Sequence, residues 1–318
     1  MVKSIHLFGG SGFIGSNTIR ELQTDYQIQN IDKKNSPLCA TSILDICESQ
    51  KFQEIPVTAS GWVIHLAAEH ADNVSPISLY YDVNVQGTGH ILKWMRENNI
   101  NKILFTSTVA VYGLNKENPD ENFPTDPFNH YGKSKLQAED LLRAWYQEDP
   151  ENRTLVILRP TVVFGPKNRG NVYNLLQQVL SGRFMMIGSG NNKKSMAYVG
   201  NVVSFIRYIL QQANDPGYHV FNYADKPDLT TSQLLEIIST SCNKKASSFK
   251  IPYAVGFLAG KAFDVLSAIT GKKFSISSIR IKKFCSTTQF SSERVQSTDF
   301  KPPYTLQEGL KTTIESLL

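Results

Sequence analysis

The chain has 318 residues, of which 41% are hydrophobic, and it carries a formal net charge of +5 at pH 7. This size allows a large core, and it suits one large α/β unit with a smaller lobe. The four cysteines form no C-x-x-C pair, which argues against a zinc site or a disulfide framework and predicts reduced thiols in a cytosolic protein. The sequence shows neither a secretion signal nor a stretch of about 18 uncharged apolar residues, so we expect no export and no membrane span.

The strand-like stretch of residues 2–8 predicts a buried strand, and it leads directly into Gly9-Gly10-Ser11-Gly12-Phe13-Ile14-Gly15. A strand that turns at once into a helix needs positive φ or a missing Cβ, and glycine supplies both. We expect Gly9 to make the turn, Gly12 to admit a pyrophosphate, and Gly15 to let the helix pack on the sheet. Because the spacing is G-x-x-G-x-x-G rather than G-x-G-x-x-G, the motif alone does not exclude an ordinary glycine-rich turn.

Residues 27–31 predict a second strand, which ends in Asp32. A carboxylate at this position accepts both ribose hydroxyls of NAD and would repel the extra 2′-phosphate of NADP. Lys33 and Lys34 follow directly, and a nearby cation weakens that preference because it can neutralise a phosphate. The pattern predicts NAD as the cofactor.

Strand and helix patterns alternate through the first part of the chain. Strands are expected at residues 5–8, 27–31, 62–66, 102–106, 154–158 and 219–222. Helices are expected at residues 12–23, 82–98, 131–147 and 202–212. Strands that recur at roughly 30-residue steps with helices between them predict right-handed βαβ units and a parallel sheet.

The fold class predicted is therefore α/β, a Rossmann doubly wound parallel sheet with a smaller mixed C-terminal substrate lobe. We expect an NAD-binding domain at residues 1–165, completed by about residues 201–224. Residues 166–200 and 225–318 are expected to form the substrate-binding lobe.

Tyr131-Gly132-Lys133-Ser134-Lys135 places a phenol and an ammonium four residues apart, on one face of a predicted helix. A free phenol has a pKa near 10, too high for a base at neutral pH. The charge of Lys135, with that of an oxidised nicotinamide, is expected to lower the pKa of Tyr131. The phenolate could then take a proton from a sugar hydroxyl while hydride leaves the same carbon. Tyr-x-x-x-Lys alone is common by chance and gains weight only from the glycine loop and Asp32.

Hydroxyl side chains follow the predicted fourth strand, in Phe105-Thr106-Ser107-Thr108-Val109-Ala110. This is the edge at which parallel sheets bind ligands. We expect Thr108 to hydrogen-bond the reacting hydroxyl and to steady the ketone oxygen, with Ser107 as the alternative. A local bond to the backbone is the other interpretation for each hydroxyl.

With these motifs in this order, the chain resembles the extended short-chain dehydrogenases/reductases of the NAD-dependent epimerase/dehydratase type over essentially its whole length. Further matching stretches are Leu44-Asp45-Ile46, His65-Leu66-Ala67-Ala68, Asn84-Val85-Gln86-Gly87-Thr88 and Leu158-Arg159-Pro160. The resemblance implies a cofactor site made of Gly9, Gly12, Phe13, Ile14, Gly15, Asp32, Asp45, Ile46, Leu66, Ala67, Ala68, Asn84, Tyr131 and Lys135.

Within the family, the chain is most similar to bacterial 4-epimerases that act on N-acetylglucosaminyl-diphospho-undecaprenol. The resemblance implies interconversion of GlcNAc and GalNAc on undecaprenyl diphosphate, through a transient 4-keto sugar, for O-antigen or lipopolysaccharide biosynthesis. It implies that the catalytic residues are Tyr131, Lys135 and Thr108, and that the substrate-binding residues are Thr108, Glu69, Asn171 and Lys194. The alternatives are a soluble UDP-GlcNAc or UDP-glucose 4-epimerase, another NAD-dependent hydroxyl dehydrogenase, and a non-catalytic NAD-binding sensor or scaffold.

Departures from the family pattern help to sort these reactions. Dehydratase relatives carry Asp-Glu where this chain has Val109-Ala110, so an acid/base pair for removing water is missing at that point. Most nucleotide-sugar relatives have an asparagine at the place of Val162, which suggests a different carrier here. Lys194 stands where relatives place an arginine that grips the diphosphate, although a solvated loop lysine fits the sequence too.

Residues 244–283 contain nine Lys or Arg against one acid, Asp264, and the cations are interleaved with an apolar run over residues 251–260. One interpretation is a core helix with a solvated basic face. The other is a surface that meets an anionic membrane or a lipid diphosphate. We expect a cytoplasmic homodimer, in peripheral contact with the inner face of the cell membrane, with no metal site and no nucleic-acid partner.

Overall fold

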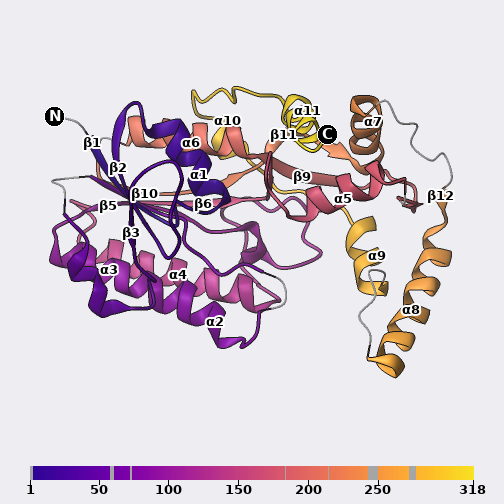
Figure 1. Cartoon of the computed structure of the whole chain (residues 1–318), viewed down its shortest axis with the longest axis horizontal. Helices are drawn as coiled ribbons and strands as arrows, with labels where there is room; N and C mark the ends of the chain where they lie inside the picture. Colours follow the sequence, from indigo (N-terminus) through magenta and orange to yellow (C-terminus); the bar gives the residue numbers. More distant parts are fainter. Residues whose placement is uncertain are drawn as a thin grey trace. The chain divides into compact units, whose positions relative to one another are not determined.

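The computed structural model describes residues 3–57, 61–71, 74–182, 184–213, 215–242, 250–271 and 277–318. The chain forms two compact units (Figure 1). The first consists of Met1–Val163, Val199–Ala224 and Phe290–Pro303. The second consists of Phe164–Tyr198, Asp225–Gln289 and Tyr304–Leu318.

The first unit is built on a seven-stranded sheet in the order β10-β6-β5-β4-β1-β2-β3. Its strands are β1 (Lys3–Phe8), β2 (Tyr26–Asp32), β3 (Thr41–Ile43), β4 (Trp62–His65), β5 (Lys102–Thr106), β6 (Thr154–Pro160) and β10 (Gly217–Tyr223). All neighbouring strands pair in parallel, so the prediction of a doubly wound α/β sheet is confirmed. The chain order reverses at β1, between β2 and β4, and ligands bind at such a switch point.

Helices cover both faces of this sheet. They are α1 (Phe13–Leu22), η1 (Ser49–Glu54), α2 (Ser78–Tyr81), the π-turn η2 (Asp82–Gln86), α3 (Gly87–Glu97), η3 (Val109–Tyr112), α4 (His130–Gln147), α6 (Val199–Gln212) and α10 (Glu293–Gln296). Helices α1 and α6 contact each other on one face, and α3 and α4 contact each other on the other (Figure 1).

Large apolar side chains fill the space between the sheet and the helices α3 and α4. Phe8, Phe105 and Trp145 are fully buried there, and the ring of Trp94 lies 5.8 Å from that of Phe8 in a T-shaped pair. Burial of each such side chain is worth about 1.5–3 kcal/mol. This packing fixes the strands and therefore the loops at their carboxyl ends.

The second unit has a mixed architecture. Strand β9 (Lys193–Tyr198) pairs antiparallel with β11 (Asp225–Thr230) in this unit. The sheet order is β11-β9-β7, and β7 (Val162–Phe164) is the strand in which the chain passes from the first unit to the second. A second small sheet joins β8 (Met186–Ile187) to β12 (Lys250–Ile251). The helices are α5 (Asn171–Leu180), α7 (Thr231–Ser241), α8 (Tyr253–Thr270), α9 (Ser278–Cys285) and α11 (Leu306–Glu315).

The compact units divide the chain differently from the predicted domains at one segment, because Phe290–Pro303 is part of the first unit. The ring of Phe300 lies 5.0 Å from that of Phe205, and the ring of Phe290 lies 6.1 Å from that of Tyr112. These aromatic contacts bury the segment on the first unit. A stretch this short has no periodicity that shows which core it joins. The assignment of NAD to one unit and substrate to the other stays a prediction.

Candidate functional site

The glycine turn after β1 contacts the loop that follows β4. Gly9 has φ of +86°, and an added Cβ would lie 2.5 Å from the backbone nitrogen of Ala67. Beside it, the N–H of Leu66 donates to the carbonyl of Phe8 at 2.8 Å. An added Cβ at Gly15 would lie 2.3 Å from the carbonyl oxygen of Gly9. Gly9 and Gly15 are therefore required for the backbones to approach.

Gly12 differs from these two glycines because it faces outward. It is exposed, and within 4 Å an added Cβ would meet only the carbonyl oxygen of Gly9, at 3.3 Å. It is the N-cap of α1, which no side chain caps. The first N–H groups of a helix, here including those of Phe13 and Ile14, have no partner within the helix, and the helix dipole favours an anion beside them. This open helix start fits the pyrophosphate of NAD.

Asp32, the last residue of β2, is tied to the same turn. One carboxylate oxygen accepts the N–H of Ser11 at 3.0 Å, and the other accepts the N–H of Lys34 at 3.0 Å. A carboxylate has about four lone-pair sites, so capacity is left for the two ribose hydroxyls. The placement fits the predicted role of Asp32.

The two residues expected at the adenine end, Asp45 and Ile46, differ in which of their groups are accessible to a cofactor. Asp45 is half-buried, and its carboxylate accepts the N–H of Cys47 at 3.0 Å. The side chain of Ile46 is buried in the core, where an added Cβ on Gly87 would lie 2.6 Å from its Cδ1. A contact between Ile46 and adenine would therefore involve its backbone rather than its side chain.

Asn84 lies behind the loop that contains Leu66, Ala67 and Ala68. It is 1% exposed, and its amide donates to the carbonyl of Glu69 and to Oγ of Ser134, both at 2.9 Å. Its own oxygen accepts the N–H of Glu69 at 2.8 Å. Both amide hydrogens are thus used inside the protein, so Asn84 fixes this loop against α4. A direct bond from Asn84 to the cofactor would require one of these bonds to break.

Helix α4 carries the predicted base. Asn129 caps the helix by accepting the N–H of Gly132 at 2.8 Å, and Tyr131 and Lys135 follow one turn apart. The hydroxyl of Tyr131 is hydrogen-bonded to the side chain of Thr108, whose Oγ1 also accepts the N–H of Ala110 at 3.1 Å. The structure thus brings together the three residues predicted to be catalytic.

Ser107, the alternative to Thr108, points elsewhere. Its hydroxyl donates to the carboxylate of Glu139 at 2.5 Å, and the residue is 3% exposed. The geometry therefore favours Thr108 as the hydroxyl beside Tyr131.

Lys135 is 1% exposed, and its ammonium lies 3.9 Å from the centre of the Phe105 ring. Among the residues that the structure describes, it forms no ion pair, because the acid one turn further on, Glu139, is bound to Arg159 by two hydrogen bonds of 2.9 and 2.6 Å. Burial lowers the pKa of Lys135 to about 7, while the charge of Glu139 acts in the opposite direction.

The expectation that Lys135 lowers the pKa of Tyr131 fails for the protein by itself. Burial raises the pKa of Tyr131 to about 12, the hydrogen bond from Thr108 lowers it only in part, and nearby Tyr80 raises it. Tyr131 and Lys135 are both removed from water, so each favours its neutral form. A positive charge bound beside Tyr131 would reverse that preference.

The residues predicted to bind the substrate are spread over both units. One carboxylate oxygen of Glu69 accepts the N–H groups of His70 at 3.0 Å and Ala71 at 3.2 Å, as in a local turn. Asn171 begins α5 in the second unit and is exposed. Lys194, also in the second unit, donates to the carbonyl of Ser286 at 2.5 Å, and burial lowers its pKa to about 8. The substrate roles of these residues stay predictions.

A buried polar network supports α4 and was not anticipated from the sequence. Arg159 donates from its remaining nitrogen to the hydroxyl of Tyr112 at 2.8 Å, and that hydroxyl donates to Asn222 at 2.8 Å. Arg143 adds a second cation to Glu139 at 2.9 Å. The sequence offered one signal for this network. Glu139 follows Lys135 by four residues, so the two side chains lie on the same face of the helix, and if one is buried the other is buried too.

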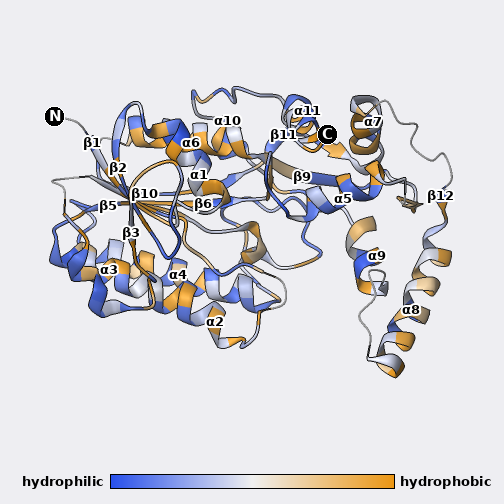
Figure 2. Ribbon diagram, viewed as in Figure 1, coloured by the Kyte–Doolittle hydropathy of each residue, from blue (hydrophilic) through white to orange (hydrophobic). Residues whose placement is uncertain are grey.

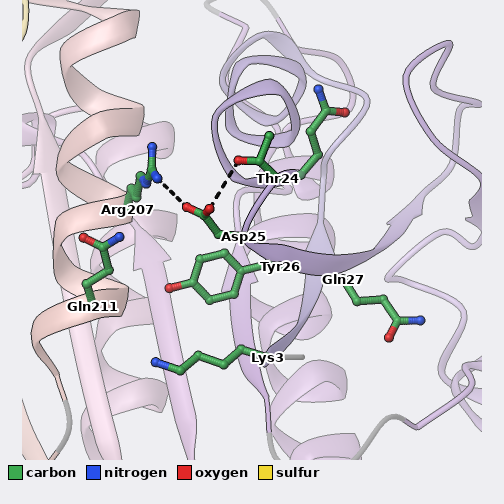
Figure 3. Close-up of a pocket in the computed structure, with 8 residues that line it drawn as sticks. Lys3, Thr24, Asp25, Tyr26, Gln27, Arg207 and Gln211 are labelled. Atoms are coloured by element: carbon green, nitrogen blue, oxygen red, sulfur yellow. Dashed lines mark hydrogen bonds and ion pairs between the residues drawn. The ribbon is translucent and has the colours of Figure 1, made fainter. Parts of the chain in front are cut away.

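A separate surface hollow of about 630 Å³ lies at the amino ends of β1 and β2, the edge opposite the glycine turn (Figure 3). Asp25 pairs there with Arg207 from α6, with Lys3 and Tyr26 nearby (Figure 3). These charges largely neutralise one another, so the hollow is an unpromising second site. Over the described ranges of the chain, no three His, Cys, Asp or Glu side chains are grouped to hold a metal ion.

Substitution of the glycines should separate cofactor binding from folding. Gly12→Ala is expected to fold normally but to bind NAD at least about tenfold more weakly, because the new methyl group enters the anion site. Gly9→Ala should lower the free energy of unfolding by more than about 2 kcal/mol, since it adds a clash to a positive φ. Calorimetric titration with NAD and urea denaturation measure the two effects. Equal NAD affinity in Gly12→Ala and wild type would contradict the assignment.

The ionisation of Tyr131 should depend on the cofactor. Without NAD, we expect its phenol to stay protonated below about pH 10, because burial opposes the phenolate. With oxidised NAD, whose nicotinamide is cationic, the transition should move to lower pH. Phenolate absorbance against pH, as the difference between wild type and Tyr131→Phe, measures it. A Lys135→Met control should show a smaller shift, and titration curves that coincide with and without NAD would refute the idea.

Comparison with known proteins agrees with a dinucleotide site at the glycine turn. Residues 5–224 match the NAD dependent epimerase/dehydratase family. An Escherichia coli O157:H7 protein, N-acetyl-alpha-D-glucosaminyl-diphospho-ditrans,octacis-undecaprenol 4-epimerase, is 53% identical over 99% of this chain and 95% of its own length. A UDP-glucose 4-epimerase of Vibrio cholerae is 28% identical over 100% of this chain and 96% of its own.

Solved structures share the fold at low identity. The UDP-glucose 4-epimerase of Thermus thermophilus in complex with NAD has a TM-score of 0.74 at 20% identity, covering 98% of both chains. The UDP-N-acetylglucosamine 4-epimerase of Methanobrevibacter ruminantium has a TM-score of 0.75 at 21% identity, covering 99% of this chain and 98% of its own. By its sequence, its sheet and its glycine turn, this chain belongs to the NAD-dependent epimerase/dehydratase family.

Proposed function

We propose that the protein is an NAD-dependent 4-epimerase that interconverts GlcNAc and GalNAc carried on undecaprenyl diphosphate. The observation that carries this proposal is the 53% identity, over 99% of the chain, to the E. coli enzyme whose name states that substrate and reaction. The hydrogen bond between Tyr131 and Thr108 and the position of Lys135 one turn away support it. The product would supply a sugar for O-antigen or lipopolysaccharide biosynthesis.

Each residue of the proposed site has a distinct task. The phenolate of Tyr131 accepts the proton of the sugar O4, and the hydroxyl of Thr108 stabilises the ketone oxygen that forms at C4. NAD, which the open helix start at Gly12 and the carboxylate of Asp32 would hold, would supply the acceptor and later the donor of the hydride at C4. Tyr131 then gives its proton back to O4. In its charged form, Lys135 would add to the effect of a bound nicotinamide cation in favouring the phenolate, and the apolar ring of Phe105 beside it excludes water.

The surroundings of Thr108 favour epimerisation over elimination. Val109 and Ala110 follow it in η3, so these positions supply no acid and no base for removing water. Lys194 is our candidate for the diphosphate, because a half-buried amine with a pKa of about 8 is still mostly charged at neutral pH. Glu69 and Asn171 are proposed to contact the sugar.

A lipid-linked substrate also bears on location. We propose a cytoplasmic enzyme in peripheral contact with the inner face of the cell membrane, where such a substrate is held. We further propose a homodimer through α3 and α4, as the family resemblance suggests. Sedimentation at several protein concentrations would test the dimer.

The carrier can be tested directly. Purified protein would be incubated separately with GlcNAc-diphospho-undecaprenol and with UDP-GlcNAc, and the released sugar analysed for configuration at C4. We expect GalNAc from the lipid-linked substrate, with no net NADH. Conversion of UDP-GlcNAc alone would instead identify a soluble nucleotide-sugar epimerase. NADH formed in proportion to product would identify a dehydrogenase, and bound NAD without turnover would indicate a sensor.

Substitutions should separate chemistry from support. Tyr131→Phe should lower kcat by about 10³-fold or more, since the proton acceptor is lost. Thr108→Ala should lower kcat by roughly 10²-fold with a small change in KM, because its hydroxyl acts on the developing oxyanion. The matched control is Ser107→Ala, whose hydroxyl bonds Glu139 instead, and it should keep kcat within about threefold of wild type. A larger loss in Ser107→Ala than in Thr108→Ala would reverse the assignment.

A further inference from the structure

One face of α8 packs against the rest of the second unit. Gly256 and Gly260 are its two buried residues. An added Cβ at Gly260 would lie 2.8 Å from Cδ1 of Ile281 on α9. The carboxylate of Asp264 accepts the N–H and the hydroxyl of Ser278, at 3.2 and 2.5 Å. The glycines and Asp264 thus hold α8 closely against α9 and leave the opposite face outward.

That outward face is apolar along its whole length. Its large side chains, with their exposed fractions, are Val255 (56%), Leu258 (68%), Val265 (59%), Leu266 (42%) and Ile269 (77%). Successive members are three, seven, one and three residues apart, and at 3.6 residues per turn these spacings place all five on one side of the helix. Apolar residues recur along α8 in Figure 2. A soluble helix normally buries such a stripe, and here the glycines are buried instead, so the stripe needs a partner of its own.

Helix α8 lies along a membrane more readily than it crosses one. It has 18 residues and a mean hydropathy of 1.2, and in the described part of the chain it is the one helix long and apolar enough to span a bilayer. It carries Lys261 and Asp264, however, and α9 covers one of its sides. A helix with one covered side cannot be surrounded by lipid, whereas a helix lying in the interface plane exposes only its apolar face to it.

The charge around the stripe identifies the kind of surface. Lys250, Lys261, Arg280 and Lys282 are exposed, and the acid Asp264 is held by Ser278. Lys244, Lys245, Lys272 and Lys273 belong to the same basic segment and lie outside the described residues. Of these cations, Lys261 is on α8 itself, three residues after Leu258 and four before Val265, so it flanks the stripe. An apolar stripe flanked by a cation, in a segment with this excess of positive charge, matches an anionic lipid surface. Two copies packed through this face would bring like charges together, which disfavours self-association.

We propose that the stripe formed by Val255, Leu258, Val265, Leu266 and Ile269 docks the protein on a bilayer that contains anionic lipids. The stripe inserts below the lipid headgroups, and Lys261, which flanks it on α8, binds a lipid phosphate. Docking of this kind brings the enzyme to a substrate that is itself anchored in the membrane, and in that respect the inference rests on the proposed function.

The test uses the full-length protein and vesicles without substrate. Sedimentation with vesicles of phosphatidylcholine and phosphatidylglycerol would be compared for wild type and the double variant Leu258→Gln/Ile269→Gln. We expect the double variant to partition at least about tenfold more weakly, since burial of even one such side chain is worth about that factor. Both side chains are exposed, so circular dichroism should show an unchanged fold. Leu318→Gln is the matched control, because Leu318 is 78% exposed and lies outside the stripe.

Several outcomes would overturn the docking surface. Equal partitioning of wild type and the double variant would do so, and so would equal binding to phosphatidylcholine alone. A variant that changes the sedimenting mass in solution without changing vesicle binding would identify the stripe as a subunit interface. A raised KM for the lipid-linked sugar with unchanged vesicle binding would identify a groove for the polyprenyl chain. Because vesicle binding needs no turnover, it can succeed or fail independently of the epimerase assay.

Discussion

The candidate site depends on the burial of Lys135 without an ion-pair partner among the described residues. The acid within reach, Glu139, is neutralised by two hydrogen bonds from Arg159 and a third from Arg143. Had Glu139 been free, it would have formed an ordinary ion pair with Lys135 and kept that amine permanently charged. Instead the amine is held near its point of titration, beside a tyrosine that burial keeps neutral. In the proposed mechanism, the strength of Tyr131 as a proton acceptor therefore depends on what binds next to it.

The sheet explains why this acceptor lies beside a dinucleotide site. Parallel pairing puts the carboxyl ends of β1, β2, β4 and β5 at one edge, so the glycine turn, Asp32, the Leu66–Ala68 loop and Thr108 are carried by adjacent strands. The close approach at Gly9 joins two of these loops, and Asn84 ties one of them to α4. The loops proposed to hold the cofactor are thus connected to the helix that carries the proposed catalytic residues.

Local patterns in the sequence were enough to predict most of this framework. Strand-like stretches indicated β1 and β2, and a carboxylate ended the second of them. The four-residue spacing placed Tyr131 and Lys135 on one helix face. Properties that arise from distant parts of the chain could not be predicted. The partner of Glu139 lies 20 residues away in sequence, and the raised pKa of Tyr131 depends on burial that a sequence does not display. The edge strand β3 has three residues, which are too few to show the alternation of apolar and polar side chains that predicts a strand.

The proposed reaction consumes no cofactor and leaves its product on the same lipid, and this bears on the role of α8. Since the hydride is returned to the same sugar, the reaction has no net redox change and the cofactor need not leave. Substrate and product then differ at a single carbon, and both stay on the same lipid in the same membrane. An enzyme of this kind gains nothing from returning to solution between turnovers, because every molecule it acts on lies in one plane. A surface helix with its glycines inward and its leucines outward is poorly suited to water and well suited to such a plane.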